Sequence, residues 1–262
     1  MTTQGGTSGV ESIKVELDSR ILKVRLLRPE RRNALTLEMY AVLSSALARA
    51  EADPQVRVVL LAGSGGSFCS GNDVNAFPAD PRSAGPTPVM HFVEALVRTT
   101  VPVVAAVEGV AAGIGSTLLL HCDAVVGDAA TRIVFPFLNM ALVPEAGSSL
   151  LLTRQLGYTR AADLMLRAAS IEGAEAHRLG ILSTLAAPGE VERTALAIAA
   201  ELAAKPPQAM RRSKRLLKGD VEALLQRIRD EERELFEGLA SEEGAEALGA
   251  FREKRRPDFS RF

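Results

Sequence analysis

Two glycine-rich segments of the chain, each directly after an apolar run typical of a buried strand, are candidates for chemistry. The first, Gly63–Asp73, follows Val56–Leu61, and the second, Glu108–Gly115, follows Val103–Val107. Backbone N–H groups at a helix start have no partner inside the helix, so they can bind negative charge. One such loop is more often only a tight turn that glycine permits. Two of them, each after a strand, predict two N–H groups that converge on one oxygen.

Other chemistries are disfavoured by what stands in and around these segments. Phe68 occupies a position where a dinucleotide fingerprint needs glycine, and Asn72-Asp73 follow Gly71 where a phosphate-binding loop needs Lys and Ser or Thr. The sequence has no G-x-S-x-G elbow. Cys69 has no neighbouring base that predicts a nucleophilic role. Two cysteines without C-x-x-C spacing and three scattered histidines predict no metal site.

Composition limits the class of protein further. The charges of the 31 basic and 32 acidic residues nearly cancel, so the chain is not generally basic. Aromatic residues make up only 4% of the chain and tryptophan is absent, so few side chains could stack on nucleotide bases, and we expect no nucleic-acid partner. Residues 1–11 are rich in Thr, Gly and Ser, which predicts a disordered tail rather than a signal peptide. The apolar run at 101–120 is interrupted by Glu108 and three glycines, so we predict no membrane span and a cytoplasmic location.

Around the two segments, hydrophobic periodicity predicts an α/β core at 12–200 and a helical region at 201–262. Thr36 is expected to cap a helix that ends before Asp53-Pro54, and the proline-rich stretch Phe77–Pro88 is expected to be a loop. The further expected strands are Ile13–Leu17, Ile21–Leu27, Ala124–Val126 and Ile133–Phe135. The further expected helices are Met90–Val97, Leu150–Leu156, Arg160–Ala168, Glu172–Leu179, Glu190–Ala203 and Pro207–Leu217, and the last segment, Val221–Phe251, has a helical, charge-rich pattern.

The order and spacing of four motifs resemble the crotonase (enoyl-CoA hydratase/isomerase) superfamily from Ile13 to Phe259. The motifs are Arg28-Pro29-Glu30 with Asn33-Ala34-Leu35, Phe68-Cys69-Ser70-Gly71-Asn72-Asp73, Gly109 with Gly113-Ile114-Gly115, and the ending Phe251–Phe259. The resemblance implies a crotonase fold, with repeated ββα units in a spiral core and a C-terminal helical trimerisation region. It also implies a homotrimer or a dimer of trimers.

The resemblance implies an acyl-CoA thioester as substrate, with coenzyme A as part of that substrate and no separate cofactor. Its carbonyl oxygen would lie in an oxyanion hole formed by the backbone N–H groups of Asn72 and Ile114. One such donor typically lowers the barrier by about 3–4 kcal/mol. The implied substrate- and CoA-binding residues are Arg28, Ala34, Ser70, Gly71, Asp73, Gly113, Phe251 and Lys254, the last two toward a neighbouring subunit.

A single acidic residue fits the family's position for a catalytic base. Typical hydratases of the family use two glutamates, but Thr117 and Phe137 occupy those positions here. The stretch from Pro136 to Ser149, which contains Glu145, resembles Δ3,Δ2-enoyl-CoA isomerases of the peroxisomal type. There one glutamate moves a proton from C2 to C4, and no water is activated. An apolar wall would raise the pKa of Glu145 and keep it basic.

Several alternatives stay open at this point. Pro144-Glu145 also suits a helix start, with proline at the first position and an acid favoured by the helix dipole. Hydration by Glu145 alone, and a non-catalytic acyl-CoA-binding paralogue, are the competing functions. Asp73 is expected to order its loop, Asp123 to be structural, and His121 to meet a helix dipole as a cation-capable side chain. The basic cluster at 211–218 is either a solvated face balanced by Asp230–Glu237 or a contact with CoA phosphates.

Overall fold

The computed structural model describes residues 12–73 and 87–262. The predicted tail at 1–11 and nearly all of the predicted loop Phe77–Pro88 lie outside the described residues. A six-stranded sheet forms the base of the molecule. Its only antiparallel pair is the first hairpin, and all other neighbours are parallel. In spatial order, the strands are β1 (Ile13–Asp18), β2 (Ile21–Leu26), β3 (Val58–Ala62), β4 (Val103–Val107), β6 (Ala124–Gly127) and β9 (Thr184–Leu185).

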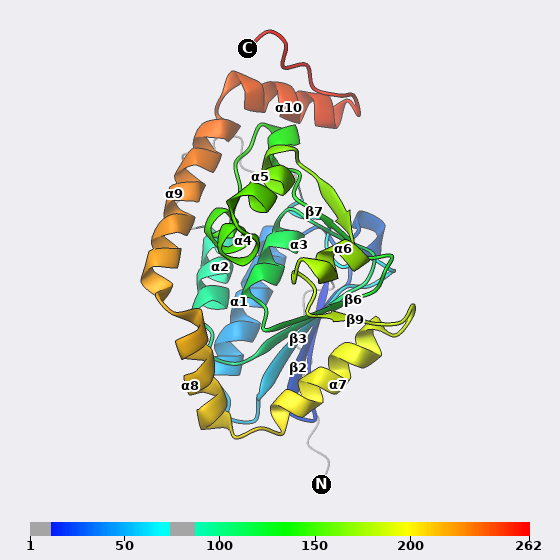
Figure 1. Cartoon of the computed structure of the whole chain (residues 1–262), viewed down its shortest axis with the longest axis vertical. Coiled ribbons are helices and arrows are strands. Elements are labelled where there is room, and N and C mark those ends of the chain that lie inside the picture. The colour runs from blue at the N-terminus through cyan, green and yellow to red at the C-terminus, as the bar shows by residue number, and fades with distance from the viewer. Residues whose placement is uncertain (1–11, 74–86) are drawn as a thin grey trace.

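Both faces of this sheet are covered, which explains the wholly apolar runs of β3 and β4. On one face lies α7 (Val191–Ala203), whose buried residues pack on β3, β4 and β6. On the other face lie α1 (Leu37–Ala52) and α2 (Pro88–Arg98), which pack against each other (Figure 1). The predicted cap at Thr36 is confirmed, since its hydroxyl accepts a hydrogen bond from the Met39 N–H.

A second, three-stranded sheet lies beside the first and contains two strands that the sequence did not predict, at 110–112 and 170–172. It consists of β5 (Val110–Ala112), β7 (Arg132–Val134) and β8 (Ser170–Glu172). β5 lies inside the second glycine-rich segment, and Ala111 on it forms a parallel bridge with Cys69 of the first segment. This bridge aligns the two segments side by side, so the strand positions the candidate site.

Helices cover the remaining core. The predicted helical pattern over 221–251 is confirmed, but it forms two helices, because the chain breaks near Ser241 and this side chain caps the second one. The longest helix, α9, runs along one side of the molecule against α2 and α4 (Figure 1). The other helices are η1 (Pro29–Arg31), α3 (Ile114–Thr117), η4 (Leu118–His121), η5 (Phe137–Met140), α4 (Ser148–Leu156), α5 (Tyr158–Leu166), α6 (Gly173–Arg178), α8 (Pro207–Lys218), α9 (Val221–Leu239) and α10 (Glu242–Arg252).

Within the described ranges, none of these helices has the length and apolar character that crossing a membrane requires.

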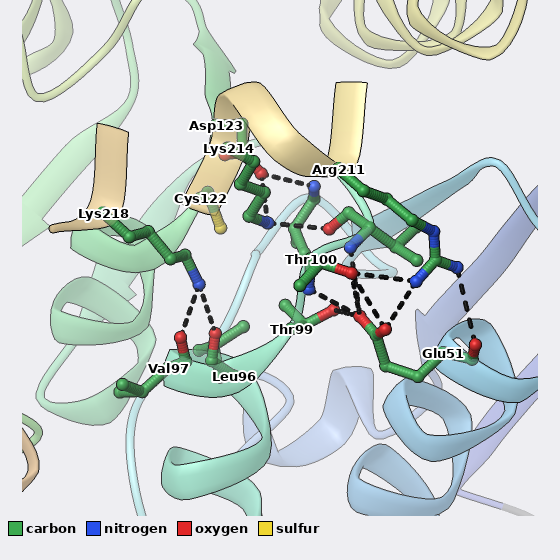
Figure 2. A network of polar contacts seen from close by, with 12 residues as sticks. Glu51, Leu96, Val97, Thr99, Thr100, Cys122, Asp123, Arg211, Lys214 and Lys218 are labelled. Atoms are coloured by element: carbon green, nitrogen blue, oxygen red, sulfur yellow. Dashed lines mark hydrogen bonds and ion pairs between the residues drawn. The ribbon is translucent and has the colours of Figure 1, made fainter. Parts of the chain in front are cut away.

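Helix α8 is fastened to the core by buried cations, which corrects the expectation of a solvated basic face. Lys214 is 3% exposed, and its Nζ donates to the Val101 carbonyl at 2.7 Å and to the Asp123 carboxylate at 2.6 Å (Figure 2). Asp123 also accepts a hydrogen bond from the Val103 N–H at 2.7 Å. The structural role predicted for Asp123 is confirmed, whereas Lys214 is neither solvated nor balanced by the acidic run of α9.

Two further members of the basic cluster, Arg211 and Lys218, continue this attachment, whereas Arg212 and Arg215 are exposed (Figure 2). Lys218 donates to the carbonyls of Leu96 and Val97 in the last turn of α2, at 2.9 and 2.7 Å. A cation at a helix C-terminus is favoured by the helix dipole. Arg211 pairs with Glu51 at 2.6 Å. These contacts join α8 to α1 and α2, the helices that form one side of the candidate site.

Candidate active site

A cavity of about 820 Å³, including its part open to solvent, lies between the two glycine-rich segments and helices α1, α2 and α9. Its walls are mainly apolar side chains from these three helices. The polar lining residues in the described part of the chain are Asn72, Asp73, Thr87, Glu145 and Glu232. This size and lining are typical of a site for a largely apolar ligand with a few polar groups that orient it.

The two glycine-rich segments meet at the inner end of this cavity. The Ala112 N–H donates to the Cys69 carbonyl at 2.9 Å, and a Cβ built on Gly113 would lie 3.7 Å from the Gly71 Cα. Gly71 and Gly113 have φ angles of +105° and +54°, which L side chains rarely adopt. The glycines therefore permit both the turns and the close approach of the two backbones.

Asn72 and Ile114, the predicted oxyanion donors, both line the cavity. Ile114 is the first residue of α3, so its N–H has no intrahelical partner. Within residues 12–73 and 87–262, neither of these two N–H groups donates a hydrogen bond. Free N–H groups beside one cavity are what binding of a carbonyl oxygen with developing charge requires.

The position of Asn72 is fixed from two sides. The backbone around it is bridged to Leu35, whose N–H donates to the Gly71 carbonyl and whose carbonyl accepts the Asp73 N–H, both at 2.9 Å. On the other side, the Tyr40 hydroxyl donates to the Asn72 Oδ1. Burial, and secondarily the charge of Glu145, raise the pKa of Tyr40 well above its usual value, so the hydroxyl remains a donor.

Arg28 and Ala34, two of the implied CoA-binding residues, lie next to this loop and form one network with Asp73. The Arg28 guanidinium pairs with the Asp73 carboxylate at 3.0 Å and donates to the Ala34 carbonyl at 2.6 Å. The buried Asn33 accepts the Arg28 N–H and donates to the carbonyls of Ser64 and Ser67. The network connects the segment after β2 (residues 28–34) to the first glycine-rich segment.

Glu145 lines the cavity and faces the same glycine backbone. A Cβ built on Gly113 would lie 3.9 Å from the Glu145 Oε1. Burial raises the pKa of Glu145 to about 7, with a further contribution from the charge of Glu231. Helix α4 begins only at Ser148, with Gly147 as its N-cap, so the interpretation of Pro144-Glu145 as a helix start is wrong. Glu145 is thus a half-buried carboxyl on the cavity wall, with a pKa near neutrality.

The segment that carries Glu145 is held by Glu231, a residue that the sequence analysis did not single out. This buried side chain on α9 accepts the Gly147 N–H at 2.6 Å and the Ser149 N–H at 2.9 Å, and it also accepts the Ser149 hydroxyl. These bonds satisfy free N–H groups at the start of α4. The local sequence gives no signal for this role, because Glu231 belongs to a charge-rich helix distant in the chain.

His121 holds the same segment from the core side. Its ring Nε2 donates to the Ala146 carbonyl at 2.7 Å, and burial lowers the pKa of His121 to about 4. The ring is therefore neutral near pH 7, and the expectation of a cation-capable side chain that meets a helix dipole is wrong. A neutral ring suits this buried position, and its hydrogen bond to the carbonyl holds Ala146, the residue that follows Glu145.

Five other predicted positions lie away from the cavity lining. Thr117 and Phe137, which stand where typical hydratases have glutamates, are buried without lining the cavity. Phe251 and Lys254 lie at the exposed end of α10 and do not line the cavity of their own chain. Ser70 instead donates its hydroxyl to the Arg31 carbonyl at 3.1 Å. Glu232, a carboxyl that lines the cavity together with Asp73 and Glu145, was missed because a charged residue in α9 carries no local signal.

Several known proteins are similar to this chain in sequence and in fold. The sequence profile of the family described as enoyl-CoA hydratase/isomerase matches residues 16–261. The 1,2-epoxyphenylacetyl-CoA isomerase of Escherichia coli K12 is 33% identical, over 96% of this chain and 99% of its own. Enoyl-CoA hydratase EchA19 of Mycobacterium tuberculosis is 32% identical, over 96% and 97%. The crystal structure of an enoyl-CoA hydratase/isomerase from Pseudoalteromonas atlantica T6c superposes with a TM-score of 0.89 at 38% identity, over 95% and 99%.

Proposed function

Since the chain belongs to the enoyl-CoA hydratase/isomerase family and has its crotonase fold, we propose that it shifts the double bond of a 3-enoyl-CoA to the 2-position. The thioester oxygen binds to the N–H groups of Asn72 and Ile114. The acyl chain extends into the apolar part of the cavity between α1, α2 and α9. Glu145 is the proton shuttle, and coenzyme A enters only as part of the substrate.

In this reaction, the ionised Glu145 removes a proton from C2 of the substrate. The electrons of the C2–H bond form a C1–C2 double bond, and the carbonyl π electrons move onto the thioester oxygen to give a dienolate. When the carbonyl is restored, the C1–C2 electrons form the C2–C3 double bond, and the electrons of the former C3–C4 double bond take up at C4 the proton that Glu145 returns. Negative charge on the thioester oxygen in between is stabilised by the two N–H groups. One carboxylate that is restored at the end of the cycle suffices, and no water is consumed.

The observation that carries this proposal is the position of Glu145. It is a carboxyl with a pKa of about 7, beside the glycine backbone at which Asn72 and Ile114 present free N–H groups. A base with a pKa near the working pH is half ionised and still able to return its proton. Thr117 and Phe137, at the positions of the hydratase glutamates, support isomerisation over two-carboxylate hydration.

The test compares wild type with Glu145→Gln on 3-enoyl-CoA and on 2-enoyl-CoA. We expect conversion of the 3-enoyl substrate, and a loss of kcat of at least about a hundredfold in the variant. Binding of a saturated acyl-CoA, measured by calorimetry, should be retained. Glu237→Gln, a change of an exposed glutamate on α9, is the matched control.

Two results would contradict the proposal. Hydration of 2-enoyl-CoA without isomerisation would favour the hydratase function, which the names of several relatives keep open. Binding of acyl-CoA without turnover of either substrate, and without an effect of Glu145→Gln, would favour a non-catalytic binding paralogue.

We also propose that the chain assembles as a homotrimer or a dimer of trimers. Phe251 is 50% exposed at the end of α10, and Lys254 follows it, so both are available to a neighbouring chain. In such an assembly these residues would contact the CoA of the adjacent subunit. The mass of the protein in solution, measured by light scattering, tests the assembly.

A further inference from the structure

Glu232 brings a carboxyl into the otherwise apolar wall that α9 contributes to the cavity. The residues of α9 that line the cavity are Ile228, Glu232, Leu235 and Phe236, at the spacing of one helical face. Three of these four residues are apolar. The fourth, Glu232, lies between Ile228 and Leu235 along the helix, and residues of α1 and α2 line the same cavity.

Among the described residues, Glu232 differs from the charged residues next to it in having no hydrogen-bond or ion-pair partner. Its neighbour Glu231 is bonded to the start of α4, and Asp230 pairs with Arg233 at 3.1 Å. Glu232 is half-buried, and within the described residues it forms no hydrogen bond or ion pair. The described lining of the cavity also contains no Lys, Arg or His that could neutralise it.

A carboxyl in this position is unfavourable for a pocket that binds only hydrocarbon. Partial burial raises the pKa of Glu232, which reports the loss of hydration of its charged form. Contact with an alkyl chain would remove the remaining water without replacing its hydrogen bonds. A substrate group that donates a hydrogen bond to the carboxylate would replace them.

We propose that Glu232 makes the cavity selective for acyl groups that carry a hydrogen-bond donor, a hydroxyl or an amine, beyond the reacting carbons. This inference rests on the proposed binding of an acyl-CoA in the cavity. The same carboxylate repels acyl groups that end in a second carboxylate. Glu232 is therefore a specificity-determining residue and leaves the proton transfer to Glu145.

A role as a second catalytic base fits the contacts less well. Glu145 and Glu232 share no hydrogen bond in the described structure, and the charge that raises the pKa of Glu145 comes from Glu231. Glu145 also faces Gly113 of the glycine backbone, whereas Glu232 lies among the α9 side chains. The two carboxyls thus contact different parts of a bound substrate.

The experiment uses three sets of saturated acyl-CoAs of matched chain lengths, which end in a methyl, a hydroxymethyl or a carboxylate group. Their dissociation constants are measured by calorimetry for wild type, Glu232→Leu and Glu232→Gln. We expect wild type to bind the best-fitting hydroxyl compound about tenfold more tightly than its methyl counterpart. Glu232→Leu should reverse this order, and Glu232→Gln should keep the preference for the hydroxyl and admit the carboxylate compound.

The matched control is Glu234→Leu, which removes an exposed glutamate of the same helix and should leave the order unchanged. The same ranking of the three ligands in wild type and in both Glu232 variants would overturn the inference. If Glu232→Leu fails to fold, Glu232→Gln still tests the inference, because this variant should bind the carboxylate compound more tightly than wild type does. Because the ligands do not react, a failed isomerase assay would refute the proposed function and leave this ranking intact.

Discussion

Glu145 shows at the scale of one residue how surroundings set the chemistry of a side chain. An exposed glutamate is almost fully ionised at neutral pH and a weak base. In this cavity, burial and the charge of Glu231 raise the pKa to about 7. The direction of this shift was predicted from the apolar residues near Glu145 in sequence and is confirmed. The contribution of Glu231 could not be predicted, because 86 positions separate the two residues.

Because the pKa of Glu145 is raised in the folded protein, we expect the difference in stability between wild type and Glu145→Gln to depend on pH. The folded protein holds a proton on Glu145 up to about pH 7, whereas the unfolded chain releases it near its ordinary value of 4.5. Between these two values the unfolded chain has lost the proton that the folded protein still holds. The free energy of unfolding therefore falls as the pH rises, and the loss is complete above about pH 7. The variant has no such loss.

Urea unfolding of both proteins at about pH 5 and at about pH 8 measures this effect. Glu145→Gln should be more stable than wild type at the higher pH by about 2–3 kcal/mol, and the difference should fall below about 1 kcal/mol at the lower pH. In parallel, kcat/KM of wild type should rise with pH through about 7 as the base ionises. A stability difference independent of pH would show that Glu145 is not the titrating group.

At the scale of elements, α1 illustrates what a periodic pattern predicts and what it omits. The sequence places Tyr40 among the apolar positions of this helix, and it is indeed 1% exposed. The pattern does not reveal that its hydroxyl reaches Asn72, 32 positions along the chain. A helix face predicts which side chains are buried, but the partner of a buried hydroxyl depends on how the elements are packed.

We expect Tyr40 to position the oxyanion loop and Tyr40→Phe to lower kcat about tenfold with little change in KM. The change leaves the ring in the core and removes the bond that holds Asn72, a loss of about 1–1.5 kcal/mol. In an Asn72→Ala background, the same change should have almost no further effect, because Tyr40 acts through that side chain. Steady-state kinetics of the two single variants and the double variant measure the coupling.

Tyr158, which is 75% exposed, offers the control: Tyr158→Phe should leave kcat and KM unchanged. Equal losses on Tyr40→Phe in both backgrounds, together with a lower unfolding midpoint, would assign Tyr40 a purely structural role.

The other elements show the same division between local and distant information. The strand pattern at Val103–Val107 is confirmed, because five apolar residues in a row specify burial on both faces. The strand β5 was missed because three residues between glycines give no periodicity, and their pairing with β7 and Cys69 is a tertiary contact. The resemblance placed Asn72, Ile114 and Glu145 on one cavity, whereas periodicity alone would not have grouped them.

At the scale of the whole molecule, the attachment of α8 joins the C-terminal helices to the core. Lys214 reaches Val101 and Asp123, which precede it by 113 and 91 positions (Figure 2). Its neighbours in sequence are exposed basic residues, so composition predicted a solvated face for the whole cluster. The helix that follows, α9, carries Glu231, Glu232 and part of the cavity wall. Any loosening of α8 would therefore reach the site through the chain.

Lys214→Met tests whether this attachment stabilises the fold as a whole. The change keeps most of the aliphatic stem but leaves the Asp123 carboxylate without its cation and the Val101 carbonyl without its donor. Because Asp123 remains 31% exposed, we expect a loss of about 2–3 kcal/mol in the free energy of unfolding, somewhat less than for a fully buried pair. The double change Lys214→Met with Asp123→Asn should cost less than the sum of the single changes.

Arg212, an exposed residue of the same cluster, provides the matched control. Arg212→Met should change the free energy of unfolding by no more than about 0.5 kcal/mol. The KM for acyl-CoA decides between the two interpretations of the cluster, because a contact with CoA phosphates would make Arg212→Met raise KM without a change in stability. Since Lys214, Lys218 and Arg211 already bind groups of the chain itself, we expect KM to stay constant and only the stability of the Lys214 variants to fall.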